Sequence, residues 1–282
     1  MKIVYSPKCL EYIDLASPET PGRISYCVEL LKKSGYQFIE PDLAQEEDIK
    51  LVHSQDLIEK VKNEIKIDTN DTDVKNIYTY SMLAAGGAIK ACEIPLQTGE
   101  TALSLMRPPG HHAGKDFNGG FCYFNNIAIA VAKNLKNMKK VAILDIDCHH
   151  GNGTEDIFFR NTKVIYVSLH QAHLYTDTGL SSKFNCYNYP MEPKTSEEVY
   201  LQNLDIAIRN IYDFTPELLA VSLGFDTYKN DPLGEIKLEI ESYKKIGQKI
   251  KALKLTTFIV LEGGYNTADM PMCLQSFLEG ME

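Results

Sequence analysis

The stretch DIDCHHGNG, residues 145–153, follows an apolar run directly and carries two acids and two imidazoles. Side chains alternate along a strand, so Asp145, Asp147 and His149 are expected on one face, with the two carboxylates about 7 Å apart. At an effective dielectric constant of about 20, the repulsion between the carboxylates is roughly 2 kcal/mol before any desolvation cost. Because no Lys or Arg lies between Lys140 and Arg160, a bound cation is the economical way to neutralise the pair.

Two acids and one histidine would leave a divalent metal with an open coordination position, which is typical of a catalytic site. Asp226, in GFDT, is the expected third ligand beside Asp147 and His149. These donors suit Zn²⁺ and would also accept Fe²⁺ or Mn²⁺. The alternative is a strand end with solvated acids, but it leaves unexplained why four other loops carry similar residues.

Two further segments carry groups suited to acid–base and oxyanion chemistry. His111 and His112 follow RPPG, and one imidazole near a metal-bound water can act as a general base. Asp145, which is not needed as a ligand, could hydrogen-bond one of these histidines and fix its tautomer. Tyr265 follows two glycines, and its phenol could donate to a developing oxyanion. Together these groups predict metal-assisted hydrolysis of a carbonyl compound.

Five short apolar runs indicate the buried strands that must position these side chains: residues 102–106, 141–145, 164–169, 218–223 and 258–261. Helical patterns alternate with them, which predicts a parallel sheet covered by helices on both faces. Each run ends in a Gly-rich polar segment, and ligands bind beyond the carboxyl ends of parallel strands. No linker divides the chain, so we expect a single α/β domain over residues 1–282.

Composition narrows the classes of function. The chain has 282 residues, a formal net charge of −9 and a pI of about 5.4, which argues against binding nucleic acid by phosphate neutralisation. Its seven cysteines are widely spaced and form no CxxC pair, as in a reduced intracellular protein. The N-terminus has no apolar signal core and no run reaches transmembrane length. We therefore expect a cytoplasmic protein with no membrane partner, while export by another route stays open.

A family resemblance is carried by six segments: RPPGHHA (107–113), GFCYFNN (120–126), DIDCHHGNGTEDIF (145–158), VSLHQ (167–171), LGFDTYKNDPLG (223–234) and EGGYN (262–266). Together they resemble the zinc-dependent histone deacetylase family, with most likeness to its class II-like bacterial members. They are also similar to acetylpolyamine amidohydrolases and acetoin-utilisation proteins. The resemblance implies the three-layer arginase/deacetylase α/β fold, with a mainly parallel sheet of about eight strands.

The resemblance also implies catalytic roles. Zinc would be held by the three ligands already named: Asp147, His149 and Asp226. His112 would act as general base and later as general acid, and His111, paired with Asp145, would assist electrostatically. Tyr265 would stabilise the tetrahedral oxyanion.

The remaining implied sites are a substrate tunnel, monovalent-cation sites and an internal channel. The tunnel would be formed by Gly120, Phe121, Tyr175, Leu233 and Gly264, with Asp71 as a rim acid for which Asp68 or Asp73 could substitute. A structural potassium ion would be held by Asp145, Asp147, His149, Ser168 and Leu169. A second monovalent cation would be held by Phe158, Asn161 and Val164. The channel behind the metal would include Arg23.

Several functions stay open on the sequence. The leading hypothesis is removal of acetyl or related acyl groups from lysine side chains, because Leu233 resembles the acyl-lysine enzymes, whereas a polyamine-selective branch has an acid there. The alternatives are an acetylpolyamine amidohydrolase and a non-catalytic acyl-lysine binding module. A two-manganese ureohydrolase would need carboxylates that these loops do not supply. Thr176 and Asp177 replace the Pro-Gly of the usual tunnel segment, which predicts a different rim.

Overall fold

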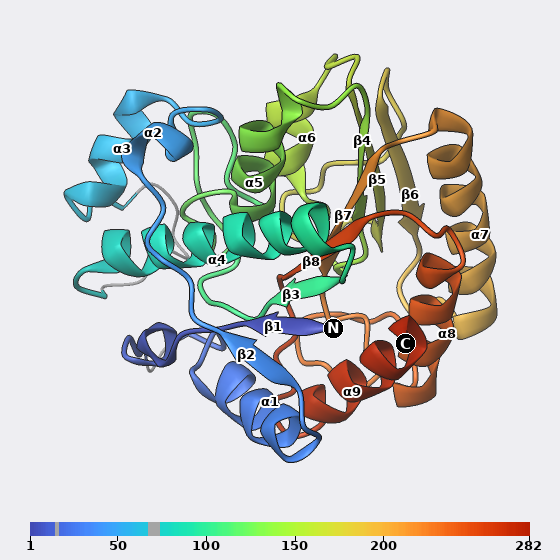
Figure 1. Ribbon diagram of the computed structural model, residues 1–282. Helices are drawn as coiled ribbons and strands as arrows, with labels where there is room; N and C mark the ends of the chain where they lie inside the picture. The colour runs from blue at the N-terminus through green and yellow to red at the C-terminus, as the bar shows by residue number, and fades with distance from the viewer. Residues whose placement is uncertain (15–16, 67–73) are drawn as a thin grey trace.

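The strands form one parallel sheet in the order β2-β1-β3-β8-β7-β4-β5-β6 (Figure 1). The computed structural model describes residues 1–14, 17–66 and 74–282. Every pair of neighbouring strands in the sheet is parallel, so the carboxyl ends of all eight strands lie at one edge. This edge is where the sequence analysis places the chemistry.

The five predicted runs are all strands: β3 (Ala102–Ser104), β4 (Val141–Asp145), β5 (Val164–Gln171), β7 (Leu218–Leu223) and β8 (Thr257–Leu261). Three strands were not among them: β1 (Lys2–Val4), β2 (Gln37–Ile39) and β6 (Cys186–Met191). The first two have only three residues each, and the third alternates polar and apolar residues. None of the three therefore contains the continuous apolar run that marks a buried parallel strand.

Helices cover both faces of the sheet (Figure 1). One layer contains α1 (Gly22–Lys33), α7 (Glu197–Phe214), α8 (Ile240–Lys251) and α9 (Met270–Met281). The other contains α2 (Glu46–Ile49), α3 (Gln55–Lys62), α4 (Ile77–Thr98), α5 (Asn126–Leu135) and α6 (Asn152–Phe158). A short 3₁₀ helix, η1 (Pro7–Leu10), follows β1. Within the described ranges, no helix is both long and apolar enough to cross a membrane.

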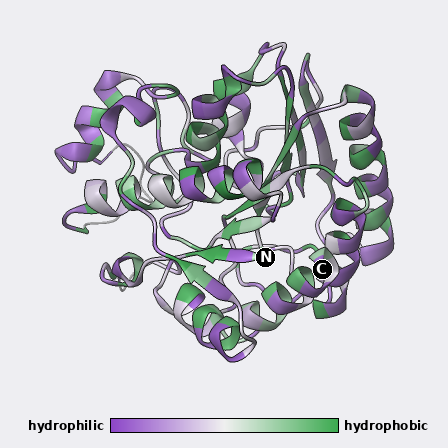
Figure 2. Ribbon diagram, viewed as in Figure 1, coloured by the Kyte–Doolittle hydropathy of each residue, from purple (hydrophilic) through white to green (hydrophobic). Residues whose placement is uncertain are grey.

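Alternate residues of each strand supply two hydrophobic cores. In β4, Ala142 and Leu144 pack toward the layer of α1, α7, α8 and α9, whereas Val141 and Ile143 pack toward the opposite layer. All five β4 residues are buried, as expected for a strand covered on both faces. Figure 2 shows the outer helices striped with hydrophobic and hydrophilic residues, the pattern of helices that cover a core on one side. The sheet is thereby packed on both faces beneath its carboxyl-end loops.

Candidate active site

The three predicted metal ligands converge beyond the carboxyl ends of β4 and β7. Asp147 and His149 lie in the loop after β4, and Asp226 lies in the loop after β7. Their ligand atoms all lie within 4.8 Å of one another, and all three side chains are buried. His149 Nδ1 is 2.8 Å from Asp226 Oδ2 and 3.2 Å from Asp147 Oδ1. The fold therefore brings together side chains that are 77 positions apart in the chain.

The hydrogen bonds around these acids leave one oxygen of each directed at the imidazole. Gly263 N–H donates to Asp147 Oδ2 at 2.7 Å, and Cys148 N–H donates to Asp226 Oδ1 at 2.8 Å. The glycine is needed because a Cβ at Gly263 would lie 2.4 Å from Asp226 Oδ2. The geometry thus presents two carboxylate oxygens and His149 Nδ1 to one point.

The charge balance at this point also fits a divalent cation. Burial and then the charge of Asp147 raise the pKa of Asp226 to about 7. Burial favours a neutral Asp147 too, but the charges on His111 and His149 outweigh it and hold the Asp147 pKa below its ordinary value. One imidazole proton cannot satisfy two buried carboxylates, whereas a divalent ion held by all three groups removes their repulsion.

The tandem histidines have opposite charge preferences. His111 Nδ1 lies 3.1 Å from Asp145 Oδ2. Burial opposes a charge on His111, but the carboxylates of Asp145 and Asp147 outweigh it and raise its pKa to about 10. Burial and then the charges on His111 and His149 lower the pKa of His112 well below its ordinary value. His112 is therefore the neutral imidazole, as a general base must be.

Asn152 fixes the tautomer of His112. The Asn152 Oδ1 atom lies 2.7 Å from His112 Nδ1 and can only accept, so Nδ1 carries the imidazole proton. The lone pair is then on Nε2, the nitrogen available to a substrate or water. The family resemblance implies this position, because Asn152 replaces an acid that pairs with the second histidine in some branches, as is usual in class II-like members.

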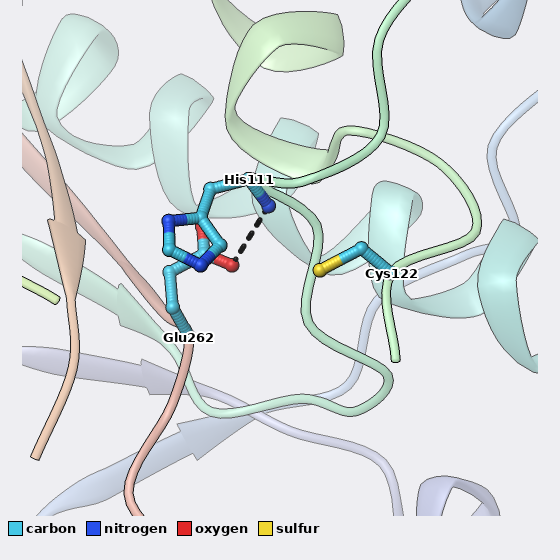
Figure 3. Close-up of side chains that lie close together, drawn as sticks. All are labelled: His111, Cys122 and Glu262. Carbon is cyan, nitrogen blue, oxygen red and sulfur yellow. Dashed lines mark hydrogen bonds between the residues drawn. The ribbon is translucent and has the colours of Figure 1, made fainter. Parts of the chain in front are cut away.

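Glu262 is a further residue that the sequence analysis did not assign. Its Oε2 accepts from the backbone N–H groups of Gly110 at 2.7 Å and His111 at 3.1 Å (Figure 3). Its Oε1 accepts from Ser222 Oγ at 3.0 Å. Glu262 therefore anchors the loop that carries the tandem histidines. Its position directly before the Gly-Gly-Tyr segment was the signal that could have identified it.

Figure 3 also shows Cys122 beside this pair. The potential ligand atoms of His111, Cys122 and Glu262 lie within 4.8 Å of one another. Burial and then the charge of Glu262 raise the pKa of the Cys122 thiol well above its ordinary value. His111 Nδ1 is paired with Asp145, and the Glu262 carboxylate accepts from N–H and O–H donors. These contacts make the group a support for the histidine loop.

A cavity of about 270 Å³ opens at the candidate metal ligands and is lined by His112, Gly120, Phe121, His149, Leu174, Tyr175, Leu233 and Tyr265. Four of the predicted tunnel residues are in this lining, and Leu174 is an addition. The Phe121 and Tyr265 rings lie 5.8 Å apart, and Tyr175 packs edge-on against His112 at 4.9 Å. Gly264 is not in the lining. The proposed rim acids Asp71, Asp68 and Asp73 lie outside the described residues.

Arg23 lies behind Tyr265, with its guanidinium 4.8 Å from the ring centroid. It donates to the carbonyls of Gly264 and Glu262, and it bonds Glu19 Oε1 at 2.8 Å. Glu19 also binds Arg107, at 2.7 and 2.8 Å. Neither Glu19 nor Arg107 was assigned a role from the sequence.

Asp231 supports the same loop from another side. Its Oδ2 accepts from the backbone N–H groups of Tyr265 at 2.6 Å and Asn266 at 3.0 Å. Asp231 also lies in a quoted segment, LGFDTYKNDPLG, but its role requires a contact across 34 positions. Both Asp231 and Arg23 therefore hold the backbone that carries Tyr265.

The residues predicted to hold potassium lie at the ends of paired strands. Asp145 of β4 is in register with Ser168 of β5, and Leu169 follows. His170 Nε2 lies 3.2 Å from the Gly179 carbonyl, which can only accept, so His170 Nδ1 accepts from the Ser168 hydroxyl at 2.8 Å. Ser168 Oγ therefore keeps lone pairs for a cation.

The second predicted cation set is arranged differently. The Phe158 and Val164 carbonyls both accept from Asn185 Nδ2, at 2.8 and 2.9 Å. The backbone carbonyls of two of the three predicted residues are thus already bonded to an amide of this chain.

Comparison with known proteins decides the family. The family model described as a histone deacetylase domain matches residues 17–281. The chain belongs to the histone deacetylase family. This deacetylase is 34% identical over 274 residues to a probable deacetylase of Archaeoglobus fulgidus, covering 88% of this chain and 76% of that protein. It is 39% identical over 206 residues to acetylpolyamine amidohydrolase 1 of Pseudomonas aeruginosa, covering 69% of this chain and 60% of that protein.

Solved structures confirm the predicted fold of this deacetylase. The acetylpolyamine aminohydrolase from Burkholderia pseudomallei superposes with a TM-score of 0.91 at 27% identity, covering 99% of this chain and 98% of that one. The HDA15 HD domain gives a TM-score of 0.91 at 27% identity, covering 99% and 90%. The fold is the arginase/deacetylase fold, and the activity is amide hydrolysis by deacetylation.

Proposed function

We propose that this deacetylase uses Zn²⁺, held by Asp147, His149 and Asp226, to remove acetyl or related acyl groups from lysine side chains of proteins or peptides. The observation that supports this substrate is the cavity lining, which is largely apolar and aromatic and includes Leu233 but no carboxylate from the described residues. Such walls favour the uncharged methylenes of an acylated lysine. A chain containing protonated amines would lose hydration there without gaining a counter-charge.

The catalytic residues have separate tasks in this mechanism. When bound, zinc supplies Lewis acidity to the acyl carbonyl and the attacking water. His112 Nε2 accepts a proton from that water and later delivers it to the leaving amine. His111 contributes positive charge beside the developing oxyanion. Burial raises the pKa of Tyr265 well above its ordinary value, so its phenol stays protonated and donates to the oxyanion.

Release of free lysine from an acetylated peptide tests this mechanism. We expect His112→Ala to lower kcat/KM by about 10²- to 10⁴-fold, because a positioned general base contributes that much. We expect Tyr265→Phe to lower it by about 10²- to 10³-fold, the usual effect of one oxyanion donor. Zinc content, measured in parallel, should not change because neither side chain is a ligand. Wild-type rates in both variants would contradict the mechanism.

Acetylpolyamine hydrolysis is the second candidate, and it is favoured by similarity to proteins named acetylpolyamine amidohydrolase. The kcat/KM for an acetyl-lysine peptide should be compared with the values for acetylputrescine and acetylspermidine on the same zinc-loaded sample. A preference for the polyamines by orders of magnitude would replace the proposed substrate class.

We further propose a structural K⁺ site at Asp145, Asp147, His149, Ser168 and Leu169, supported by the free lone pairs of Ser168.

Residues 1–282 are proposed to form one catalytic domain. All seven cysteines are free and buried, which supports a cytoplasmic location.

A further inference from the structure

The loop between β5 and β6 carries one wall of the cavity on a strained backbone. Leu174 and Tyr175 line the cavity. Directly after them, Thr176 and Asp177 have φ values of 70° and 47°, and Gly179 has φ of 71°. A β-branched residue such as Thr rarely adopts a left-handed conformation. Contacts from the surrounding structure must hold the loop in this shape.

Two buried imidazoles beneath the loop supply these contacts. The ring centroids of His150 and His170 lie 4.7 Å apart. Thr178 Oγ1 lies 2.8 Å from His150 Nδ1, and the Gly179 carbonyl lies 3.2 Å from His170 Nε2. A Cβ at Gly179 would lie 2.5 Å from His150 Cδ2, so the loop backbone rests directly on this ring.

The acceptors at each end determine the direction of the hydrogen bonds. Glu155 Oε2 lies 3.1 Å from His150 Nε2 and accepts from Asn188 Nδ2 at 2.7 Å. Because a carboxylate only accepts, a neutral His150 carries its proton on Nε2, and its Nδ1 accepts from the Thr178 hydroxyl. Thr178 Oγ1 then accepts from the Thr176 hydroxyl at 2.7 Å. The chain of bonds therefore runs from the strained residues to helix α6.

We propose that Thr178, His150 and Glu155 form a latch that holds Tyr175 at the tunnel wall, so that Thr178 and Glu155 are positioning residues for the acyl-lysine chain. Neither residue is part of the cavity lining, so both act through Tyr175. The choice of acyl-lysine as the chain rests on the proposed function. The latch itself rests only on the contacts of the loop.

Matched substitutions separate the latch from a general structural role. Thr178→Val keeps the side-chain shape but removes the hydroxyl, whereas Thr178→Ser keeps the hydroxyl. In the full-length, zinc-loaded protein, we expect Thr178→Val to raise KM for an acetyl-lysine peptide about fivefold, the effect of one lost hydrogen bond, with a smaller change in kcat. Glu155→Ala should also raise KM for this peptide. Glu155→Gln should keep wild-type KM because its amide oxygen still accepts.

Hydrogen exchange of residues 174–179 provides a readout that needs no substrate. Exchange should be faster in Thr178→Val and Glu155→Ala than in their matched controls, with the β4 and β7 amides unchanged. Equal KM and equal exchange in Thr178→Val and Thr178→Ser would overturn the latch. Faster exchange with unchanged KM would overturn the positioning role. If the wild-type protein does not hydrolyse the peptide but exchange still differs, the latch stands and the proposed substrate fails.

A separate observation concerns the turn between α6 and β5. Asn185 uses its whole amide there: Nδ2 donates to the Phe158 and Val164 carbonyls at 2.8 and 2.9 Å, and Oδ1 accepts from Arg160 N–H at 2.7 Å. A single nitrogen within 2.9 Å of both carbonyl oxygens occupies the position from which a cation would bind both. We infer that the Asn185 amide takes the place of the second monovalent cation in this chain.

Crystals soaked in Rb⁺ test this inference by anomalous diffraction. The wild-type protein should show no Rb⁺ peak among the carbonyls of Phe158, Asn161 and Val164. Asn185→Gly should gain such a peak and a K⁺-dependent increase in Tm. A peak at these carbonyls in the wild type, or none in the variant, would overturn the inference.

Discussion

His111 and His112 are adjacent and chemically identical, yet their surroundings favour a cationic imidazole at His111 and a neutral one at His112. Asp145 accepts from the first and raises its pKa to about 10, against the opposing effect of burial. The second faces a neutral amide, and burial plus nearby positive charge lowers its pKa well below 6.5. The carboxylates beside His111 thus favour electrostatic catalysis by a cation, whereas burial and the neighbouring positive charges keep His112 neutral for acid–base catalysis.

This difference predicts the pH dependence of the reaction. His112 must be neutral to accept a proton, so activity is lost as the pH falls through its pKa, and the acidic limb of kcat/KM should lie below pH 6.5. Asn152→Asp would place a carboxylate on His112 Nδ1 and move that limb upward by about 1–3 pH units. The measurement is kcat/KM against pH for an acetyl-lysine peptide at saturating zinc. An acidic limb at the same pH in both proteins would argue against His112 as the base.

Leu233 is expected to influence the preference between acetyl-lysine and acetylpolyamine substrates. Leu233→Glu would place a carboxylate in the cavity wall, where it attracts a protonated amine by about 1 kcal/mol. We expect the ratio of kcat/KM for acetylspermidine to that for acetyl-lysine peptide to rise about five- to tenfold. Leu233→Gln has nearly the same size without the charge and serves as the control. An equal rise in both variants would show that shape, and not charge, sets the preference.

At the scale of elements, a buried ion network joins α1 to the catalytic loops. Glu19 binds both Arg23 and Arg107, and Arg23 holds the carbonyls on either side of Gly263. Glu19→Gln would leave two buried guanidinium groups without a charged partner. We expect it to lower the free energy of unfolding by about 3–5 kcal/mol, measured by urea denaturation of the metal-loaded protein.

The control for this substitution is Glu47→Gln, at an exposed acid 3.9 Å from Lys50. It should change stability by less than about 0.5 kcal/mol, because exposed ion pairs contribute little. If Glu19→Gln were no more destabilising than this control, the ion pairs of Glu19 would not be what holds α1 against the catalytic loops.

The elements also show which parts of the site the sequence could predict. The run that became β4 is apolar up to Asp145, and the run that became β7 is apolar except for Ser222 and precedes Asp226, so both strands and the candidate metal ligands after them followed from local pattern. Glu262 precedes the Gly-Gly-Tyr segment, but that position did not indicate which groups it contacts, because it acts on a loop 151 positions away, and Asn185 acts on carbonyls 21 and 27 positions away. Such contacts depend on how strands are ordered in the sheet, which residue spacing does not encode.

At the scale of the whole molecule, the proposed metal site lies where separate parts of the sheet meet. Asp147 follows β4, Asp226 follows β7, and Gly263 N–H after β8 donates to Asp147. An ion bound at this point connects loops from three strands and should stabilise the folded protein as a unit. If residues 1–282 are one domain, metal-loaded and metal-free protein should each unfold in one transition.

Metal removal therefore gives a prediction for the entire chain. At free zinc 1,000 times its Kd, binding only to the folded state adds about 4 kcal/mol, which corresponds to an increase in Tm of about 8–16 °C. Chelation should remove this increase and zinc should restore it, as calorimetry can measure. Asp226→Asn loses one anionic ligand and should lose most of the zinc-dependent shift while keeping a single transition. A full shift in this variant would place the stabilising zinc elsewhere, and two transitions in the wild type would divide the proposed domain.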